Sequence, residues 1–80
     1  MDKEVIRSTD EVLREFPPIG KYRVRHLRHT KTGAETLDIR EYVSAETFEG
    51  FTRRGIRMDR AQADLLRDLL RDILKDWLTV

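Results

Sequence analysis

The feature that most constrains the fold is the C-terminal stretch, residues 60–79, which contains neither glycine nor proline. Its apolar residues recur in adjacent pairs every four positions, from Leu65 and Leu66 to Trp77 and Leu78, with charged residues between them. This spacing is typical of an amphipathic helix. Asp59 and Gln62 match an N-terminal cap, so we predict one long helix that begins after Asp59.

The apolar stripe of this helix is wider than one small sheet can cover. A helix of about 20 residues is on the order of 30 Å long, which is comparable with the whole domain. The chain has 80 residues and no cysteine, so disulfides cannot stabilise it and self-association is the expected substitute. We therefore expect a homodimer with an interface formed by Leu66, Leu69, Leu70, Ile73, Leu74 and Trp77.

The middle of the chain has the two-residue period of β-strands. Apolar and polar residues alternate from Gly20 onward and again after a turn signal at Lys31-Thr32-Gly33, which predicts a hairpin. The face expected to be buried carries Tyr22, Val24, Leu37 and Ile39. The opposite face is expected to carry Arg23, Arg25, Asp38, Arg40 and Tyr42. The alternation slips at His26-Leu27, which indicates a β-bulge or a strand end.

Residues 51–58 predict one bent strand or two short strands that follow a turn over residues 44–50. Ile56 and Met58 are expected to face inward and Arg57 outward. Gly55 indicates a tight bend or a close approach of a neighbouring backbone.

The first 19 residues are expected to form an accessory arm. Ser8 and Glu11 fit a capping box, so residues 8–16 predict a short helix that Pro17-Pro18 end. The expected organisation is an arm over residues 1–19, formed by this helix and an extended strap, and an α+β domain over residues 20–80. Because the opening residues are charged and no apolar run reaches about 20 residues, we expect no membrane insertion and a cytoplasmic, nucleoid-associated location.

The charges are concentrated in blocks, although 16 basic residues nearly balance 15 acidic ones. Residues 20–31 hold five Lys or Arg and no acidic residue, residues 51–60 hold four arginines, and an acidic segment separates the two blocks. If folding joins the blocks, they form an arginine-rich surface suited to phosphates and unpaired bases. The alternative is that these arginines are only the solvated side of a sheet. Tyr42 and Phe51 are candidates for base stacking, and Phe51 is equally compatible with a core position.

No enzyme motif stands out, and we expect no catalytic site, metal or cofactor. The two histidines, His26 and His29, lie three apart, so they point to opposite faces of a strand and do not form a metal site. Three acidic residues between the basic blocks, Glu35, Asp38 and Glu41, are more typical of ion pairs than of a carboxylate site.

Three segments in order resemble the PC4/p15 transcriptional coactivator family. They are Lys21-Tyr22-Arg23-Val24-Arg25, Leu37-Asp38-Ile39-Arg40-Glu41-Tyr42 and Arg53-Arg54-Gly55-Ile56-Arg57-Met58. The resemblance covers about residues 20–76 and is closest to a minimal, prokaryotic-like form. It implies a curved four-stranded antiparallel sheet followed by one long helix. It also implies a homodimer that binds single-stranded DNA in basic grooves of the sheet and has no enzymatic activity.

The hypothesis is therefore a homodimer that holds unpaired DNA or RNA strands during transcription, replication or repair, with no small-molecule substrate. The alternative is a protein-interaction module that uses the leucine-rich helix. The expected nucleic-acid-binding residues are Lys21, Arg23, Arg25, Arg28, Lys31, Arg40, Tyr42, Phe51, Arg53, Arg54 and Arg57.

Overall fold

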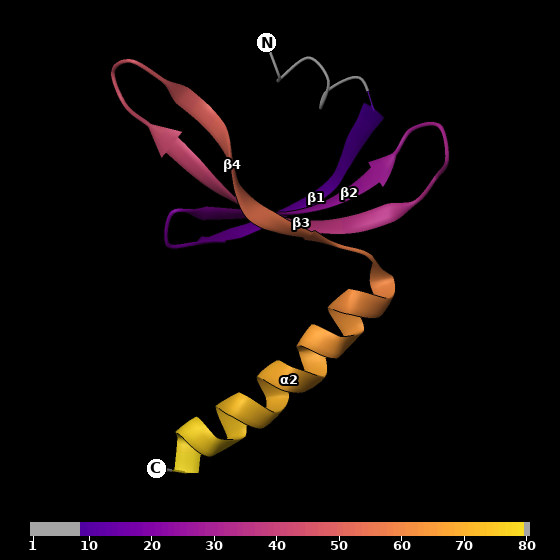
Figure 1. The fold of residues 1–80 in the computed structure, drawn as a ribbon, viewed down its shortest axis with the longest axis vertical. Coiled ribbons are helices and arrows are strands. Elements are labelled where there is room, and N and C mark those ends of the chain that lie inside the picture. Colours follow the sequence, from indigo (N-terminus) through magenta and orange to yellow (C-terminus); the bar gives the residue numbers. More distant parts are fainter. Residues whose placement is uncertain (1–8, 80) are drawn as a thin grey trace.

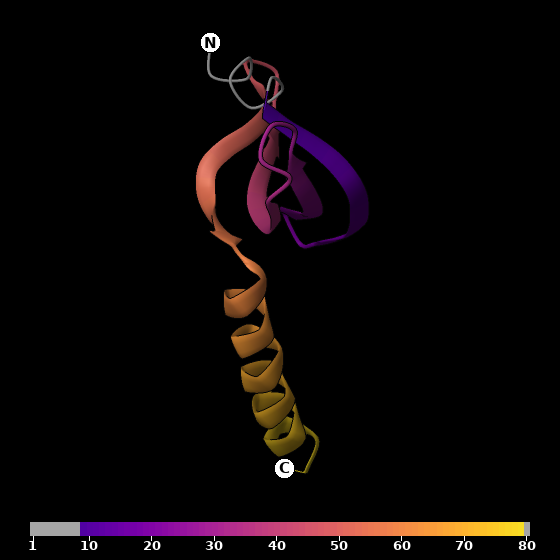
Figure 2. The ribbon, with the colours of Figure 1, turned by 90° about the vertical axis from the view of Figure 1, so that its right-hand side faces the viewer.

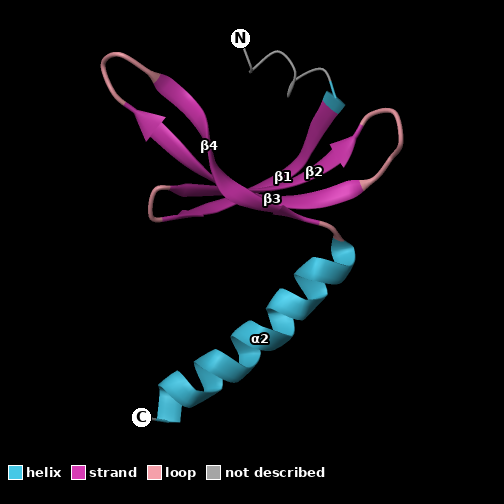
Figure 3. Ribbon diagram, in the orientation of Figure 1, coloured by secondary structure: helices cyan, strands magenta, loops and turns pink. Residues whose placement is uncertain are grey.

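The computed structural model describes residues 9–79 as one sheet followed by one helix (Figure 1). The elements are β1 (Asp10–Ile19), β2 (Tyr22–His29), β3 (Glu35–Ser44), β4 (Glu49–Met58) and α2 (Arg60–Thr79). The four strands are antiparallel and lie in the order β1-β2-β3-β4 (Figure 3). This arrangement confirms the predicted four-stranded α+β fold.

The predicted N-terminal helix is wrong for residues 10–16, which belong to strand β1, whereas Ser8 lies outside the described residues. The pairing of β1 with β2 places Phe16 opposite Val24 and Val12 opposite Leu27, and these cross-strand contacts outweigh the helix signal within the segment. Pro17 and Pro18 fall where the register shifts, on an edge strand that tolerates missing N–H donors. The expected strap is thus part of the sheet, and residues 20–58 supply three of the four strands.

The sheet is strongly curved. In Figure 2 the edge strands β1 and β4 bow outward on the right and on the left of the central strands β2 and β3. In a flat sheet of this order the two edge strands would be about 14 Å apart. Nevertheless, the Asp10 carboxylate of β1 lies 3.1 Å from the Arg57 guanidinium of β4. We call the concave side that these two side chains share the inner face, and the opposite side the outer face.

The register confirms the predicted assignment of side chains to two faces. Arg25 pairs with Asp38, and Asp38 pairs with Arg57, so all three lie on the inner face. Val24 pairs with Ile39 on the outer face. The irregularity predicted near His26-Leu27 lies on the neighbouring strand, between Val12 and Arg14 of β1, directly opposite these two residues.

Burial within one chain differs from the prediction. The most buried side chains include Asp38 and Leu27, each 0% exposed, and Arg25, 7% exposed, and all three are on the inner face. The outer apolar residues Val24 and Ile39 are only half-buried, and Ile56 is 54% exposed. The curvature explains the difference, because the edge strands fold over the inner face and leave these outer apolar residues partly open. Met58, which lies opposite Leu37 on the outer face, is an exception at 5% exposure and is buried as predicted.

Helix α2 begins at the predicted cap and extends away from the sheet (Figure 1). The Gln62 amide N–H donates to the Asp59 carboxylate over 2.8 Å, and the Gln62 side-chain oxygen accepts from the Asp59 N–H over 3.0 Å. This reciprocal pair is a capping box. From Arg67 to Leu78 every residue is exposed, and Trp77 is 71% exposed.

Candidate nucleic-acid interface

Asp38 is the hub of the inner face. It lies in the central strand β3, with arginines directly opposite on both neighbouring strands. Its carboxylate accepts from Arg25 at 3.1 Å, from Arg40 at 3.0 Å and from Arg57 at 3.4 Å. Burial alone would raise the pKa of Asp38. The hydrogen bonds from Arg40 and Arg25 and the charges of Arg40 and Arg57 outweigh burial and lower this pKa below its ordinary value of 3.8.

These contacts limit what the predicted basic surface can bind. Arg25 is almost fully buried, and the Arg40 side chain is 17% exposed and also donates to the Arg53 carbonyl over 3.0 Å. Arg25 and Arg40 are therefore chiefly structural, since their guanidinium groups already have an anionic partner. Arg23 and Arg57 are different, because their side chains keep 38% and 39% exposure beside the same network.

Two aromatic rings continue the inner face toward the β3–β4 hairpin. Tyr42 and Phe51 are cross-strand partners, and their ring centroids are 5.1 Å apart in an edge-to-face arrangement. The Arg23 guanidinium lies 4.0 Å from the centroid of Tyr42, and the Arg25 guanidinium lies 3.9 Å from that of Phe51. Both rings are half-buried, so Phe51 belongs to this surface cluster and not to a separate apolar core. We call Arg23, Tyr42 and Phe51 the stacking cluster.

The Tyr42 hydroxyl is held in place by an acidic neighbour. It donates to the Glu49 carboxylate over 2.9 Å. This hydrogen bond, with smaller contributions from desolvation and the Glu49 charge, raises the pKa of Tyr42 above its ordinary value of 10.0. The hydroxyl therefore stays protonated at neutral pH and fixes the ring at the end of the sheet.

The most accessible basic side chains lie outside the Asp38 network. Arg53 and Arg54 are exposed on β4, where the register with β3 shifts beside Tyr42. Arg54 lies 4.0 Å from Glu41, whereas the Arg53 side chain has no polar contact with any residue in the range 9–79. Lys31 is exposed in the β2–β3 turn. Of the predicted residues, these three are the most available to a ligand.

Other predicted residues lie on the outer side of the sheet. Arg28 donates to Glu11 over 3.0 Å, and Lys21 lies 3.0 Å from Glu41. The hydrogen bonds from Lys21 and Thr52, together with the positive charges of Lys21 and Arg54, lower the pKa of Glu41. The structure therefore does not bring Lys21 and Arg28 together with the inner-face arginines. The expected ion pairing of the acidic residues is confirmed for Asp38 and Glu41.

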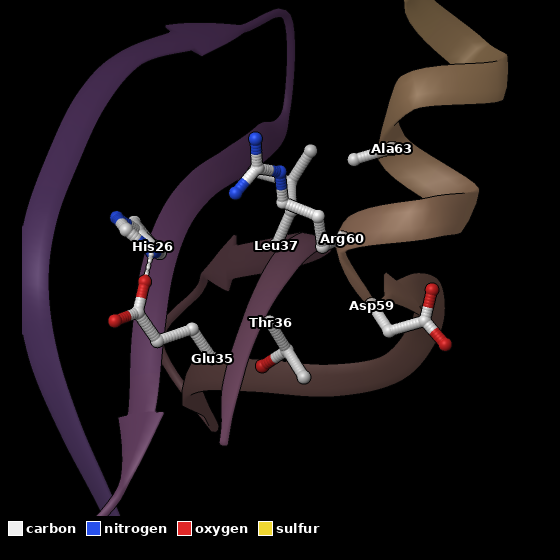
Figure 4. A pocket seen from close by; sticks show the side chains of 7 residues that line it. All are labelled: His26, Glu35, Thr36, Leu37, Asp59, Arg60 and Ala63. Carbon is white, nitrogen blue, oxygen red and sulfur yellow. Dashed lines mark hydrogen bonds and ion pairs between the residues drawn. The ribbon is translucent and has the colours of Figure 1, made fainter. Parts of the chain in front are cut away.

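A shallow pocket lies between the sheet and the start of α2 (Figure 4). Its volume is about 140 Å³, and it is lined by His26, Glu35, Thr36, Leu37, Asp59, Arg60 and Ala63. The His26 Nε2 atom is 2.8 Å from the Glu35 carboxylate. His29 has a separate role, because its Nδ1 atom accepts from the Lys31 and Thr32 N–H groups at 3.2 Å and supports the turn.

Two acidic residues of the inner face were not anticipated. Asp10 contacts Arg57, and the Glu15 carboxylate lies 3.5 Å from the Arg23 guanidinium. Both belong to β1, which the sequence pattern assigned in part to a helix. No signal in the sequence linked them to the arginines, because the pairing depends on the register of β1 and on the curvature of the sheet.

Two kinds of feature are absent from the part of the chain that the structure describes. Within residues 9–79 no three His, Asp or Glu side chains are grouped as metal ligands, and no helix there is long and apolar enough to cross a membrane. Searches of protein-family models, curated proteins and solved structures found no match for the chain. A proposal for its function therefore rests on the geometry of the inner face and on the resemblance in the sequence.

Proposed function

We propose that this protein is a non-enzymatic, homodimeric single-stranded DNA-binding protein of the PC4 type. The observation that carries the proposal is the stacking cluster, in which two aromatic rings and a partly exposed arginine lie together on the concave face of a curved sheet. Exposed Arg53 lies on the adjacent segment of β4. Stacking platforms beside basic side chains are the usual features of surfaces that bind unpaired strands.

The chemistry of the cluster suits a flexible single strand better than a duplex. Base stacking on an aromatic ring is worth about 1–3 kcal/mol per base and requires unstacked bases. A guanidinium already stacked on Tyr42 can contact a phosphate with its edge while its face stays on the ring. Arg53 then supplies charge for a neighbouring phosphate. Arg54, whose side chain lies beside Glu41 on the outer side of the same edge strand, adds positive charge at this edge, and neither residue demands a base sequence.

Arg53→Ala combined with Arg54→Ala should weaken binding to a fluorescent single-stranded DNA oligonucleotide about tenfold near 0.1 M salt. The slope of log K against log salt should become shallower by about 0.7 for each phosphate that the variant no longer neutralises. Anisotropy titrations at several salt concentrations measure both quantities, and parallel titrations with duplex DNA and RNA define the preference.

Arg67→Ala with Arg71→Ala is the matched control, because these helix arginines are 63% and 68% exposed and the charge change is the same. We expect the control to retain wild-type affinity and slope. Equal slopes in the wild type and the Arg53/Arg54 variant would show that these arginines make no phosphate contacts.

The exposed face of α2 supports the second part of the proposal, that two copies assemble. Leu69 is 52% exposed and Ile73 is 43% exposed, and both continue the apolar stripe along the protruding helix. The half-buried outer face of the sheet adds further apolar surface. An apolar surface of this extent is characteristic of an interface.

Light scattering should give a mass of twice 9.5 kDa for the wild type at micromolar concentration. Leu69→Asp with Ile73→Asp should give a single-chain mass, because burying two carboxylates in the interface costs several kcal/mol. The Arg67/Arg71 control variant should keep the wild-type mass, since it leaves the apolar stripe intact. A monomeric wild type would favour the alternative, a helix that binds a different protein.

A further inference from the structure

The arginines of the inner face that remain partly exposed already have carboxylate partners from one strand. Asp10 lies 3.1 Å from Arg57 and Glu15 lies 3.5 Å from Arg23, and both acids belong to the edge strand β1. Among residues 9–79, the other ion pair of Arg57 runs through its Nε atom, which is 3.4 Å from Asp38. The terminal guanidinium nitrogen Nη1 of Arg57 is the atom that Asp10 occupies.

These two pairs differ from the Asp38 contacts in accessibility. The side chains of Arg23 and Arg57 are more than one third exposed, and Glu15 is 46% exposed, so water and ions reach both arginines. The Glu15–Arg23 pair is exposed at both partners, and ion pairs of this kind contribute little to stability. The Asp10 side chain is only 9% exposed, so its displacement also requires the end of the edge strand to move. By contrast, Asp38 is fully buried in a central strand and cannot leave its arginines without unfolding the sheet.

A carboxylate and a phosphate bind guanidinium in the same way, through anionic oxygens that accept from its N–H groups. The inner-face positions of Asp10 and Glu15 are thus positions that fit phosphate oxygens. The Asp10–Arg57 pair also links the two edge strands, so this side-chain contact bridges the concave face between the start of β1 and the end of β4.

We propose that Asp10 and Glu15 are internal competitors that occupy the phosphate positions on Arg57 and Arg23. A bound strand must displace both carboxylates, and this competition sets its affinity. The inference rests on the proposed function, because it concerns the same surface. It assigns to β1 a role in limiting binding, in addition to its role as a strand of the sheet.

The test compares three variants of the full chain in titrations with a labelled single-stranded oligothymidylate. Glu15→Gln should bind about 2- to 3-fold more tightly than the wild type, and Asp10→Asn with Glu15→Gln about 5- to 10-fold more tightly. The double variant should also have a steeper salt dependence, by about 0.7 for each additional phosphate that it neutralises.

Glu11→Gln is the third variant and the matched control. Glu11 is on the same strand, is 52% exposed and pairs with Arg28, but that pair lies on the outer face. The Glu11→Gln variant should bind the oligonucleotide with an affinity within about 1.5-fold of the wild type, since Arg28 is directed away from the inner face. Circular dichroism melts of all variants establish that each one is folded.

The outcomes separate the two proposals. If the wild type binds and depends on Arg53 and Arg54, but the double variant binds no more tightly than Glu11→Gln, the competition is refuted and the DNA-binding function stands. If neither the wild type nor the double variant binds in low salt, both proposals fail. Tighter binding confined to the inner-face variants supports the competition.

Discussion

Replacing Asp38 with asparagine should lower the free energy of unfolding by about 3–5 kcal/mol at pH 7. The substitution keeps the size of the side chain but removes the charge that three arginines share at 3.0–3.4 Å. Arg25, 7% exposed, would then be a buried cation without an anionic partner. Because a domain of this size is stabilised by only about 5–15 kcal/mol, the loss is a large part of its stability.

Urea titrations at one fixed protein concentration measure this change, since assembly would otherwise contribute to apparent stability. Asp72→Asn is a control in which an exposed helix carboxylate undergoes the same substitution, and its effect should be within about 0.5 kcal/mol. A loss below about 1 kcal/mol for Asp38→Asn would mean that the network does not depend on this charge.

The same network predicts the acid dependence of stability. The pKa of Asp38 is lower in the folded chain than its ordinary value of 3.8, so below that pH the unfolded chain binds more protons. The stabilisation is therefore complete at neutral pH and is lost as the pH falls below about 3.8 toward the folded pKa. The Asp38→Asn variant should lack this pH-dependent part of the stability. Urea titrations from about pH 5 to about pH 2, which is about one to two units either side of the ordinary pKa, can test this.

Gly55→Ala should destabilise the fold by at least about 2 kcal/mol. A Cβ atom at Gly55 would lie 2.3 Å from the Ile39 carbonyl oxygen and 2.7 Å from the Arg40 Cα atom. Both are backbone atoms of the adjacent strand, so they cannot move without separating β3 from β4. Chemical denaturation measures the loss, and displacement of Arg53 and Arg54 should also weaken the proposed DNA binding.

Gly33→Asn provides a contrasting glycine. Gly33 lies in the β2–β3 turn at φ +78°, where a Cβ atom would have no neighbour within 4 Å, and asparagine tolerates this left-handed backbone. We expect a change below about 1 kcal/mol. If both substitutions have the same small effect, the close approach of β3 to Gly55 is not a constraint on the fold.

Local patterns were sufficient to predict several elements of this fold. The two-residue alternation around Val24 and Ile39 gave the correct faces of β2 and β3, and the Asp59–Gln62 spacing gave the start of α2. The close approach predicted at Gly55 is confirmed. Each of these features depends on residues that are near one another in sequence or directly paired in one hairpin.

The error in β1 arises because its structure is decided by pairing with another segment. Val12, Leu13 and Phe16 fit a helical spacing, but an irregularity that skips Leu13 allows Val12 and Phe16 to pair with β2. Periodicity in one segment cannot reveal which partner strand is available. The sequence pattern also could not predict that the inner face is the more buried one. That difference follows from the curvature of the sheet, which the alternation of residues does not reveal.

The candidate site was predictable in composition but not in organisation. The sequence identified the arginines, Tyr42 and Phe51, and it favoured ion pairs for Asp38 and Glu41. It could not show that one carboxylate binds three arginines from three strands, nor that Asp10 reaches Arg57 across the sheet. Those contacts divide the predicted residues into a buried structural group and an accessible group.

The order of the strands has a consequence for folding kinetics. Since β1, β2, β3 and β4 are neighbours in the sheet in the same order as in the chain, each pairing closes only a short loop. Short loops cost little entropy, and a low contact order is associated with rapid folding. The sheet is therefore expected to form in one fast, concentration-independent phase, and the proposed association of two copies through their helices should follow as a slower bimolecular phase.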